Sequence, residues 1–542
     1  MKHEPNRMMT HPLVCLLTLV GGLAVGSAIL APMASAAAPA KILHYGNAVE
    51  PQDLDPQSVM GVYEARILRA LIEGLVCSSA SMEPAPGVAK SWDISADGLI
   101  YTFHLRSDAR WSNGRAVTAH DFVQSYRRIL SPAFGAPYAD RLYYVAGAEA
   151  FHRGQLKDFE KTGFQALDTQ TLRLTLHQPA PFLLRLMTRM EWMPVPIETI
   201  AAQGPLDRPG NRWTRPENFV GNGPFLLKSW RPGQRIIVTR SPTYWDTSKI
   251  PLDEIHFHAI DNPEVEERMF RTGQLHITSM LPLSKIATYR RENPAALRID
   301  SWGGLNFYVF NVQRPQFNDG RIRRAFSLAI DRESLVKNVT LAGDEPAYSA
   351  VPPGLSGYRG GPGFKADADE ARRLLAEAGY PGGKGLPAVS LLYNTSENHR
   401  AIAEAIQQMW RRQLGVNVAL VNQEWKVYLD TIKKTHDFQV ARTGWLIAEP
   451  HLHLDRWETG NANNDAGWSS PDYDRQLRAS LAAPTLADRY ALYEGLEKIL
   501  SEEMPFMPIY FVNLARLISP KVVGYRTNPD DAYPWRDTDL RP

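Results

Sequence analysis

The sequence is poor in several features that mark particular protein classes. Its 542 residues include two cysteines, Cys15 and Cys77, too few for a disulfide framework. Lys and Arg number 60 and Asp and Glu 58, so the chain lacks the positive field with which nucleic-acid-binding proteins attract phosphates. After the first forty residues, no apolar run approaches the ~18 residues of a membrane-spanning helix. These absences exclude a disulfide-stapled small protein, a basic nucleic-acid binder and a polytopic membrane protein.

Motifs for catalysis and phosphate binding are also missing. The sequence contains no Gly-x-Ser-x-Gly nucleophile elbow, no Gly-x-x-x-x-Gly-Lys-Ser/Thr phosphate loop and no Gly-x-Gly-x-x-Gly dinucleotide fingerprint. The Gly- and Pro-rich stretches at 352–354 and 360–363 are typical of turns. We therefore expect neither an enzyme nor a cofactor, and a secreted hydrolase is the less favoured alternative.

The N-terminus has the form of a secretory signal peptide. Basic residues and an apolar run from Pro12 to Ala31 precede Ala34-Ser35-Ala36, a small-x-small pattern that signal peptidase cleaves. We predict a cleavable signal peptide over residues 1–36, cut after Ala36, and export of a soluble protein. The alternative is an uncleaved membrane anchor.

Helix-like and strand-like segments alternate along the remaining chain, which predicts a mixed α/β architecture. Strands are expected at 99–106, 171–177 and 235–240, and helices at 118–130, 367–379, 397–414 and 486–500. The stretch 503–511 is expected to connect the last of these helices to a buried strand. The helix at 397–414 leads directly into a strand, as around a parallel sheet. No low-complexity linker separates domains, so composition does not place their borders.

One cluster has the residue types of a metal site. His451, His453 and Asp455 would share one face of a strand. Because Pro450 precedes them, we favour a helix start with solvated histidines over a metal site. The 13 Trp and 21 Tyr favour a ligand cavity with flat, amphipathic walls, with ordinary core packing as the alternative for each ring.

Several strings in a fixed order resemble one family. They include Pro84-Ala85-Pro86-Gly87-Val88-Ala89, Gly221-Asn222-Gly223-Pro224-Phe225, Ser241-Pro242-Thr243-Tyr244-Trp245, Phe317-Asn318-Asp319, Tyr393-Asn394-Thr395-Ser396 and Ser470-Pro471-Asp472-Tyr473-Asp474. The sequence thereby resembles the periplasmic oligopeptide-binding proteins, the extracytoplasmic solute-binding family 5 of ABC importers. The resemblance covers nearly all of the chain after the signal peptide.

The resemblance implies an α/β fold of the type II periplasmic-binding-protein kind, with three lobes, mixed sheets and closure about a hinge. Lobe I would be discontinuous and comprise 37–72, 195–302 and 513–542, with lobe II at 73–194 and lobe III at 303–512. The implied function is capture of an oligopeptide or peptide-like solute in the periplasm and its delivery to an inner-membrane ABC permease. We expect a monomer that does not bind nucleic acid.

The resemblance also implies the site residues. Backbone groups would pair with an extended peptide, and aromatic and charged side chains would line its pockets. The backbone positions that would pair with the peptide are Val62, Gly444, Trp445 and Leu446, and the region of Gly303 and Gly304 would line the facing lobe. The aromatic walls are Tyr138, Trp425 and Trp445, and the groups facing a ligand carboxylate are His399 and Arg442.

One position departs from the family pattern. Peptide-binding members usually carry an Asp shortly after Gly-Trp that takes the ligand ammonium, whereas Gly444-Trp445 is followed by a segment that is two residues shorter and lacks it. We expect a neighbour such as Glu449 or Asp455 to replace it, with Glu449 preferred, or a ligand without a free α-amine. A helix-start carboxylate is the other interpretation of Glu449. Alternative cargoes are a murein fragment, an opine-like conjugate or a metal complex near His451 and His453.

Overall fold

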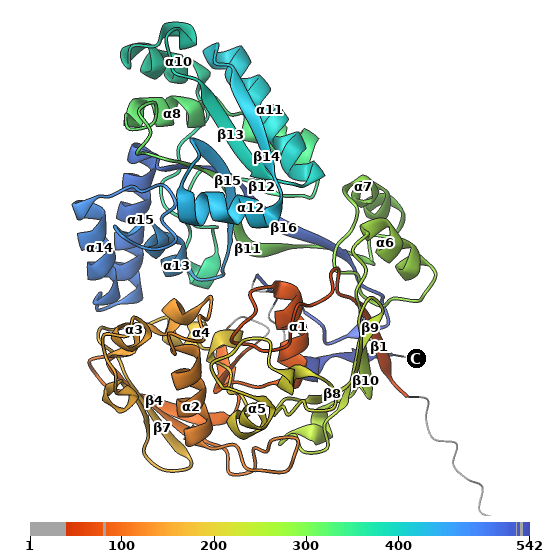
Figure 1. Cartoon of the computed structure of the whole chain (residues 1–542). Coiled ribbons are helices and arrows are strands. Elements are labelled where there is room, and N and C mark those ends of the chain that lie inside the picture. Colours follow the sequence, from red (N-terminus) through yellow and green to blue (C-terminus); the bar gives the residue numbers. More distant parts are fainter. Residues whose placement is uncertain (1–39, 80–82, 527, 530, 532–534, 542) are drawn as a thin grey trace, which may run out of the picture. The chain divides into compact units, whose positions relative to one another are not determined.

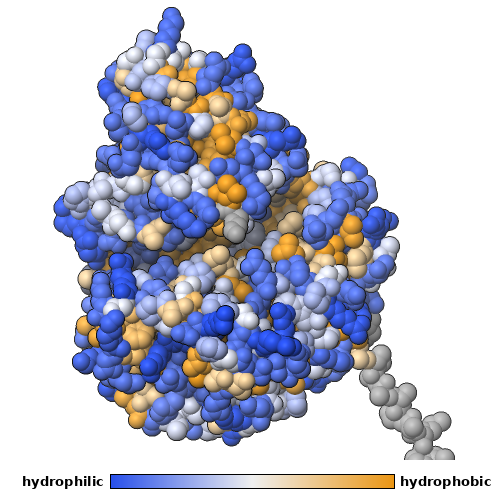
Figure 2. Space-filling view, viewed as in Figure 1, coloured by the Kyte–Doolittle hydropathy of each residue, from blue (hydrophilic) through white to orange (hydrophobic). Residues whose placement is uncertain are grey.

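The computed structural model describes residues 40–79, 83–526, 528–529, 531 and 535–541 (Figure 1). The predicted signal peptide lies outside these residues. Within them, no helix is both long enough and apolar enough to cross a membrane. The face seen in Figure 2 is mostly hydrophilic, with apolar side chains gathered in smaller areas.

The first sheet joins the start of the chain to segments about two hundred residues later. Its strand order is β1 (Ile42–Gly46), β10 (Glu254–His258), β9 (Arg235–Arg240) and β8 (Phe225–Arg231). β1 runs parallel to β10 and the other pairs are antiparallel. Alternate residues, such as Tyr45 and Phe257, pack into a core that includes Leu68 of α1 (Val62–Leu71).

The second sheet is antiparallel throughout. Its order is β4 (Ala89–Ile94), β5 (Ile100–Leu105), β7 (Thr171–Thr175) and β6 (Phe164–Ala166). The apolar side of α2 (Ala119–Ile129) covers it, with Phe122 and Tyr126 in the same core as Phe103. Thr118 caps this helix in a reciprocal capping box with Asp121.

The third sheet is the largest and has a core on each face. Its order is β12 (Glu345–Pro346), β16 (Phe506–Leu517), β11 (Leu297–Phe310), β15 (Val440–Leu446), β13 (Val389–Asn394) and β14 (Val418–Gln423). Tyr308 and Phe310 of β11 lie in one core and Phe307 and Val309 in the other, as strand alternation requires. Helices on the first side are α8 (Gly320–Leu328), α10 (Ala368–Glu377) and α11 (Glu397–Leu414), and on the second side α14 (Pro471–Leu481) and α15 (Leu486–Glu503).

β11 and β16 change register part of the way along their length. The pairing shifts between Ser301 and Gly304, opposite Asn513 and Val512. Gly303 has a φ of +56°, a left-handed conformation that a glycine adopts without a steric penalty. The extra residues of this irregularity lie in β11, opposite two consecutive residues of β16.

Most of the elements predicted from sequence are present. α11 begins at Glu397 and ends at Leu414, and it leads into β14, which pairs parallel with β13. α15 begins at Leu486 as predicted but continues to Glu503 before the buried strand β16. The mixed α/β prediction is confirmed.

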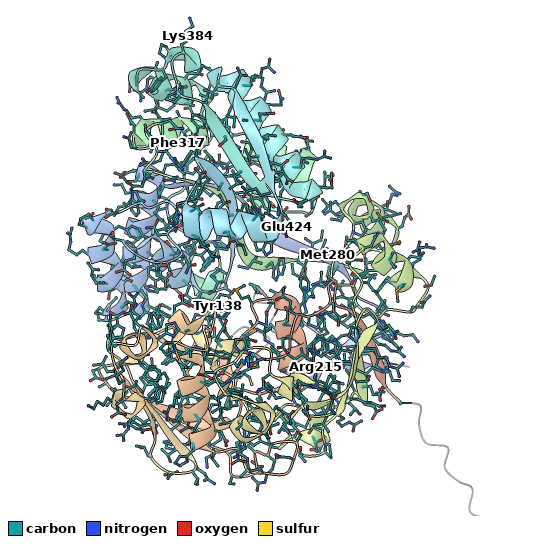
Figure 3. All side chains as sticks on the ribbon, in the orientation of Figure 1. Tyr138, Arg215, Met280, Phe317, Lys384 and Glu424 are labelled. Atoms are coloured by element: carbon teal, nitrogen blue, oxygen red, sulfur yellow. The ribbon has the colours of Figure 1, made fainter. Side chains whose placement is uncertain are left out.

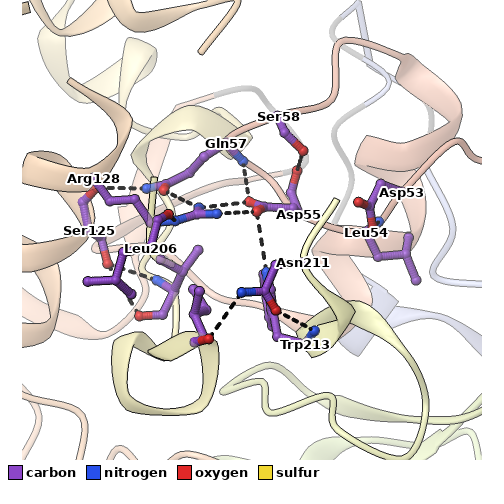
Figure 4. A network of polar contacts seen from close by, with 12 residues as sticks. Asp53, Leu54, Asp55, Gln57, Ser58, Ser125, Arg128, Leu206, Asn211 and Trp213 are labelled. Atoms are coloured by element: carbon purple, nitrogen blue, oxygen red, sulfur yellow. Dashed lines mark hydrogen bonds and ion pairs between the residues drawn. The ribbon is translucent and has the colours of Figure 1, made fainter. Parts of the chain in front are cut away.

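A buried polar network fastens the segment after β1 to α2 (Figure 4). The guanidinium of Arg128 donates to Asp55 at 2.6 Å and to the Gln57 side-chain oxygen at 2.7 Å. Trp213 donates to the same Asp55 carboxylate at 3.3 Å. Since Asp55 and Arg128 are each only 2% exposed, their charges neutralise one another away from water.

Candidate functional site

A cavity of about 670 Å³ lies between the body that carries the second sheet and residues that follow β15. One wall comes from residues 136–186 and the other from residues 445–481. Figure 3 shows Tyr138 on the side of the second-sheet body that faces α13 (Pro450–Leu454). The aromatic side chains that line the cavity include Tyr138, Tyr143, Tyr144 and Trp445, which provide flat apolar surfaces with polar edges.

Trp445 is held firmly at this cavity. It is on β15 opposite Leu305 of β11, and its indole N–H donates to the Leu452 carbonyl at 2.8 Å. The Arg456 guanidinium lies 4.6 Å from the ring centroid, a cation–π contact. The ring is therefore preorganised as a wall of the cavity.

Asp455 is the acidic group of the cavity with the most strongly altered ionisation. Burial raises the pKa of its carboxyl to about 7, and the nearby Asp140 also raises it, whereas a hydrogen bond from Tyr144 lowers it. The Tyr144 hydroxyl donates to the carboxylate at 3.3 Å. A half-buried carboxyl whose pKa is near 7 is suited to pair with a cationic group that enters the cavity.

β15 offers an open backbone edge beside the cavity. On one side it pairs with β11 from Val440 to Leu446. On the other side β13 pairs with it only at Val440 and Ala441, so the strand pairs in the described part of the chain leave Arg442 to Leu446 without a neighbour there. An extended peptide binds such an edge by adding a strand.

Gly304 allows β11 and β15 to approach closely here. It pairs with Leu446, and a Cβ at position 304 would overlap with the Leu446 Cδ2. Leu446 itself is 39% exposed. Gly304 thus shapes the sheet at the end of the open edge of β15.

Arg442 presents a guanidinium from the opposite face of β15, and no ion pair with it is found within the described residues. Its Nε is buried and has no hydrogen-bond partner among the described residues. Burial lowers the pKa of His399 to about 4, and the Arg442 charge lowers it further. His399 is therefore neutral at pH 7, and Arg442 carries the permanent charge that a carboxylate would need.

The remaining predicted residues lie elsewhere. Trp425 is 51% exposed at the start of α12 (Trp425–Asp430) and stacks on Tyr428 at 5.7 Å between centroids. Val62 is the first residue of α1. The lining of the cavity brings together Tyr138 and Trp445 but does not include Val62, Trp425 or His399.

Glu449 has partners within the chain. It is the N-cap of α13 and accepts from the His451 N–H at 3.5 Å. Ser356 donates to its carboxylate at 3.2 Å, and Arg185 of α4 (Leu183–Leu186) forms an ion pair with it at 3.3 Å. These contacts favour the helix-start interpretation of Glu449.

His451 and His453 form the predicted helix start, but the expectation that they are solvated is wrong. Each is only 2% exposed. His453 Nε2 lies 2.7 Å from the Ile447 carbonyl oxygen, and the His451 ring stacks on Phe182 with 4.5 Å between centroids. The neighbouring residues Leu452 and Leu454 pack in the core. The short helix is therefore buried, and both imidazoles contact other buried groups.

A different set of histidines was not found from sequence. Among the described residues, His44, His256 and His258 bring their donor atoms within 4.8 Å of one another. More than two hundred residues separate His44 from the other two, so no local motif links them. The available signal was His256-Phe257-His258, whose spacing places two imidazoles on one face of a strand.

Comparisons with known proteins agree on one family. The family model "Bacterial extracellular solute-binding proteins, family 5 Middle" matches residues 83–465. The periplasmic oligopeptide-binding protein OppA of Escherichia coli (strain K12) is 38% identical over 490 residues, 88% of each chain. The periplasmic murein peptide-binding protein MppA of the same organism is 33% identical over 542 residues, 98% of each chain. The crystal structure of Haemophilus influenzae OppA in complex with RPPGFSPFR has a TM-score of 0.80 and 32% identity, covering 93% of this chain and 99% of that one.

Proposed function

Because the chain belongs to the bacterial extracellular solute-binding proteins of family 5, we propose that it captures oligopeptides or peptide-like solutes in the periplasm for an ABC importer. The observation that carries this proposal is the open edge of β15 beside an aromatic cavity. Main-chain pairing recognises what all peptides share, and the cavity accepts their varied side chains. No step in this function changes the bound solute chemically.

In the proposed binding mode, the peptide lies along Arg442 to Leu446 as an added strand. Side chains leave β15 alternately toward the two faces, so Arg442 and Trp445 meet different parts of the ligand. The guanidinium of Arg442 would bind the ligand carboxylate in a bidentate manner. Neutral His399 would contribute a hydrogen bond, and Tyr138 and Trp425 would contact side chains.

The contacts of the two candidate carboxylates, Glu449 and Asp455, support one of them as the anchor of the ligand ammonium. Glu449, the preferred candidate from sequence, already forms an ion pair with Arg185 and accepts a hydrogen bond from Ser356. Asp455 lies in the cavity wall with a Tyr144 hydrogen bond. We therefore favour Asp455 as the group that replaces the missing family aspartate.

The division into lobes extends this proposal. The register change between Ser301 and Gly304 supports a hinge in β11 and β16, with lobe III at 303–512, lobe II at 73–194 and lobe I from the remaining segments after residue 36. Ligand binding would shift the population toward a closed form that the membrane permease selects. Export by a signal peptide cleaved after Ala36 and a monomeric state belong to the same proposal.

The test is to identify what the protein binds. Native mass spectrometry of protein purified from a bacterial periplasm should show a mixture of co-purified peptides, recovered intact after denaturation. Calorimetry with defined tripeptides to pentapeptides should then give saturable binding. Exclusive capture of a non-peptide solute, or cleavage of the added peptides, would overturn the proposal.

A further inference from the structure

A cluster of imidazoles lies on the outer face of the first sheet, away from the proposed solute site. His44 of β1 is the register partner of His256 on β10, and His258 follows two residues later. The alternate residues Tyr45 and Phe257 are buried in the core, so strand alternation places the three histidines together on the opposite face. None of them lines the solute cavity.

The donor atoms of the cluster are close enough to share one ion. All lie within 4.8 Å of one another. The Nδ1 of His44 is 3.1 Å from the Nε2 of His258, and the rings of His44 and His256 have centroids 4.9 Å apart. Two imidazole nitrogens at the usual 2.0–2.1 Å from a tetrahedral zinc ion are about 3.4 Å apart, so small ring movements suffice.

The surroundings of His256 provide a second, independent observation. Its Nε2 lies 2.7 Å from the Glu254 carboxylate, which fixes the tautomer with the hydrogen on Nε2. Its Nδ1 is buried and has no hydrogen-bond partner in the described part of the chain. A histidine that donates one N–H to a carboxylate and keeps the other nitrogen available is the usual arrangement of a metal-binding imidazole.

The protonation state of the cluster also suits a metal. Burial lowers the pKa of His44 and of His258 to about 4, with further contributions from the neighbouring imidazoles and from Arg235 of β9. The rings of His44 and His258 are therefore neutral at pH 7, the form that ligates metals. Other charged groups around the cluster are Lys228, paired with Glu254, and Lys521, beside His276.

We propose that His44, His256 and His258 form a binding site for a divalent first-row transition-metal ion such as Zn²⁺. Three imidazoles match the ligand preference of these metals, and the fourth position would be left to water. The ion would join the N-terminal strand β1 to β10 and stabilise the first sheet, independently of any bound solute.

The test uses untagged protein freed of metal by a chelator and titrated with zinc chloride by calorimetry. We expect one zinc ion per chain and a rise in the melting temperature on zinc addition. His258→Gln and His256→Gln should each weaken zinc binding by at least about ten-fold, and Glu254→Ala by roughly ten-fold or more through loss of the carboxylate that orients His256.

His104→Gln is the matched control. His104 is a strand histidine with a carboxylate partner, Asp93 at 2.7 Å, but it lies outside the cluster, so its variant should bind zinc as the unaltered protein does. Cobalt(II) gives a second readout that needs no variant, because a tetrahedral imidazole site produces visible absorption bands. Absence of stoichiometric zinc binding, or equal affinity in the His258→Gln and His104→Gln variants, would overturn the proposal.

Discussion

At the scale of single residues, Arg442 is the most direct test of peptide recognition. Arg442→Met keeps much of the aliphatic stem and removes the charge. Because a charge-assisted hydrogen bond contributes about 1.5–3 kcal/mol, we expect peptides with a free carboxylate to bind roughly ten- to a hundred-fold more weakly. Peptides with an amidated C-terminus should lose little affinity, as calorimetry would show.

Arg412→Met serves as the control for this change. Arg412 is an exposed arginine in the last turn of α11, so its variant alters the net charge by the same amount without altering the edge of β15. Equal losses for free and amidated peptides in Arg442→Met would contradict the carboxylate role.

Asp455 leads to a prediction about pH. Its pKa in the free protein is about 7, and only the ionised form attracts a ligand ammonium. Affinity for peptides with a free amine should therefore increase as the pH rises toward this value, by up to about ten-fold per pH unit below it, and fall again above about pH 8, where the α-amine of the peptide loses its proton. Asp455→Asn should remove this dependence, measured by calorimetry across the range.

Glu449→Gln separates the two candidate anchors. Glu449 is paired with Arg185 and caps α13. Glu449→Gln should therefore lower the stability of the protein and reduce the affinity for free-amine and N-acetylated peptides by the same factor. If Glu449→Gln instead reduces the affinity for free-amine peptides only, and Asp455→Asn does not reduce it, the ammonium is bound by Glu449.

At the scale of elements, Gly303 in β11 tests the irregular pairing of the two long strands. A Cβ at this position would lie 2.9 Å from the Pro529 Cβ and 3.2 Å from the Ala448 Cβ, at a φ of +56°. We expect Gly303→Ala to lower the free energy of unfolding by about 1–3 kcal/mol, measured by chemical denaturation.

Gly233 provides the control, because its φ is +70° and no heavy atom lies within 4 Å of the position that an alanine Cβ would occupy. Gly233→Ala incurs the backbone penalty without the clash. A loss in Gly303→Ala no larger than that in Gly233→Ala would show that the packing around β11 tolerates a side chain.

The elements could be predicted from sequence where their signals are local. α11 has apolar periodicity, Ser396 as its N-cap and Gly415 as its C-cap, and both ends were predicted correctly. The end of α15 was placed too early because Met504 adopts a left-handed conformation that the sequence does not indicate. The histidine cluster depends on the register of β1 against β10, a long-range pairing that no local pattern contains.

At the scale of the whole molecule, charged side chains buried between distant segments hold the structure together. Asp531, near the C-terminus, accepts from Arg66 of α1 at 2.6 Å and from Arg516 of β16 at 2.9 Å. All three side chains are at most 5% exposed. The family resemblance predicted that N-terminal, middle and C-terminal segments share a lobe, but not which side chains join them. Arg66 is more than four hundred residues from Arg516 and Asp531, so no local sequence signal links it to them.

Asp531→Asn should therefore be strongly destabilising, because it leaves two buried guanidinium groups without their counter-ion. Removing one partner of such a pair costs about 3–5 kcal/mol, which chemical denaturation would measure. The conservative substitution Asp55→Asn in the other buried network offers a comparison. Asp55 pairs with one buried guanidinium, that of Arg128, whereas Asp531 pairs with two, so the loss should be smaller.

The same cluster gives the stability a defined dependence on pH. Burial alone would raise the pKa of Asp531, but Arg516 and Arg66 outweigh burial and hold it at about 2, below the usual 3.8. A carboxyl whose pKa is lower in the folded state stabilises the protein above its unfolded value, and this contribution is lost as the pH falls from about 4 toward 2. The difference in unfolding free energy between the unaltered protein and Asp531→Asn should therefore be constant near neutrality and shrink in that acidic range. If this difference in unfolding free energy stays unchanged down to about pH 2, the ion pairs contribute no net stability. The surrounding packing alone would then join α1, β16 and the C-terminal segment.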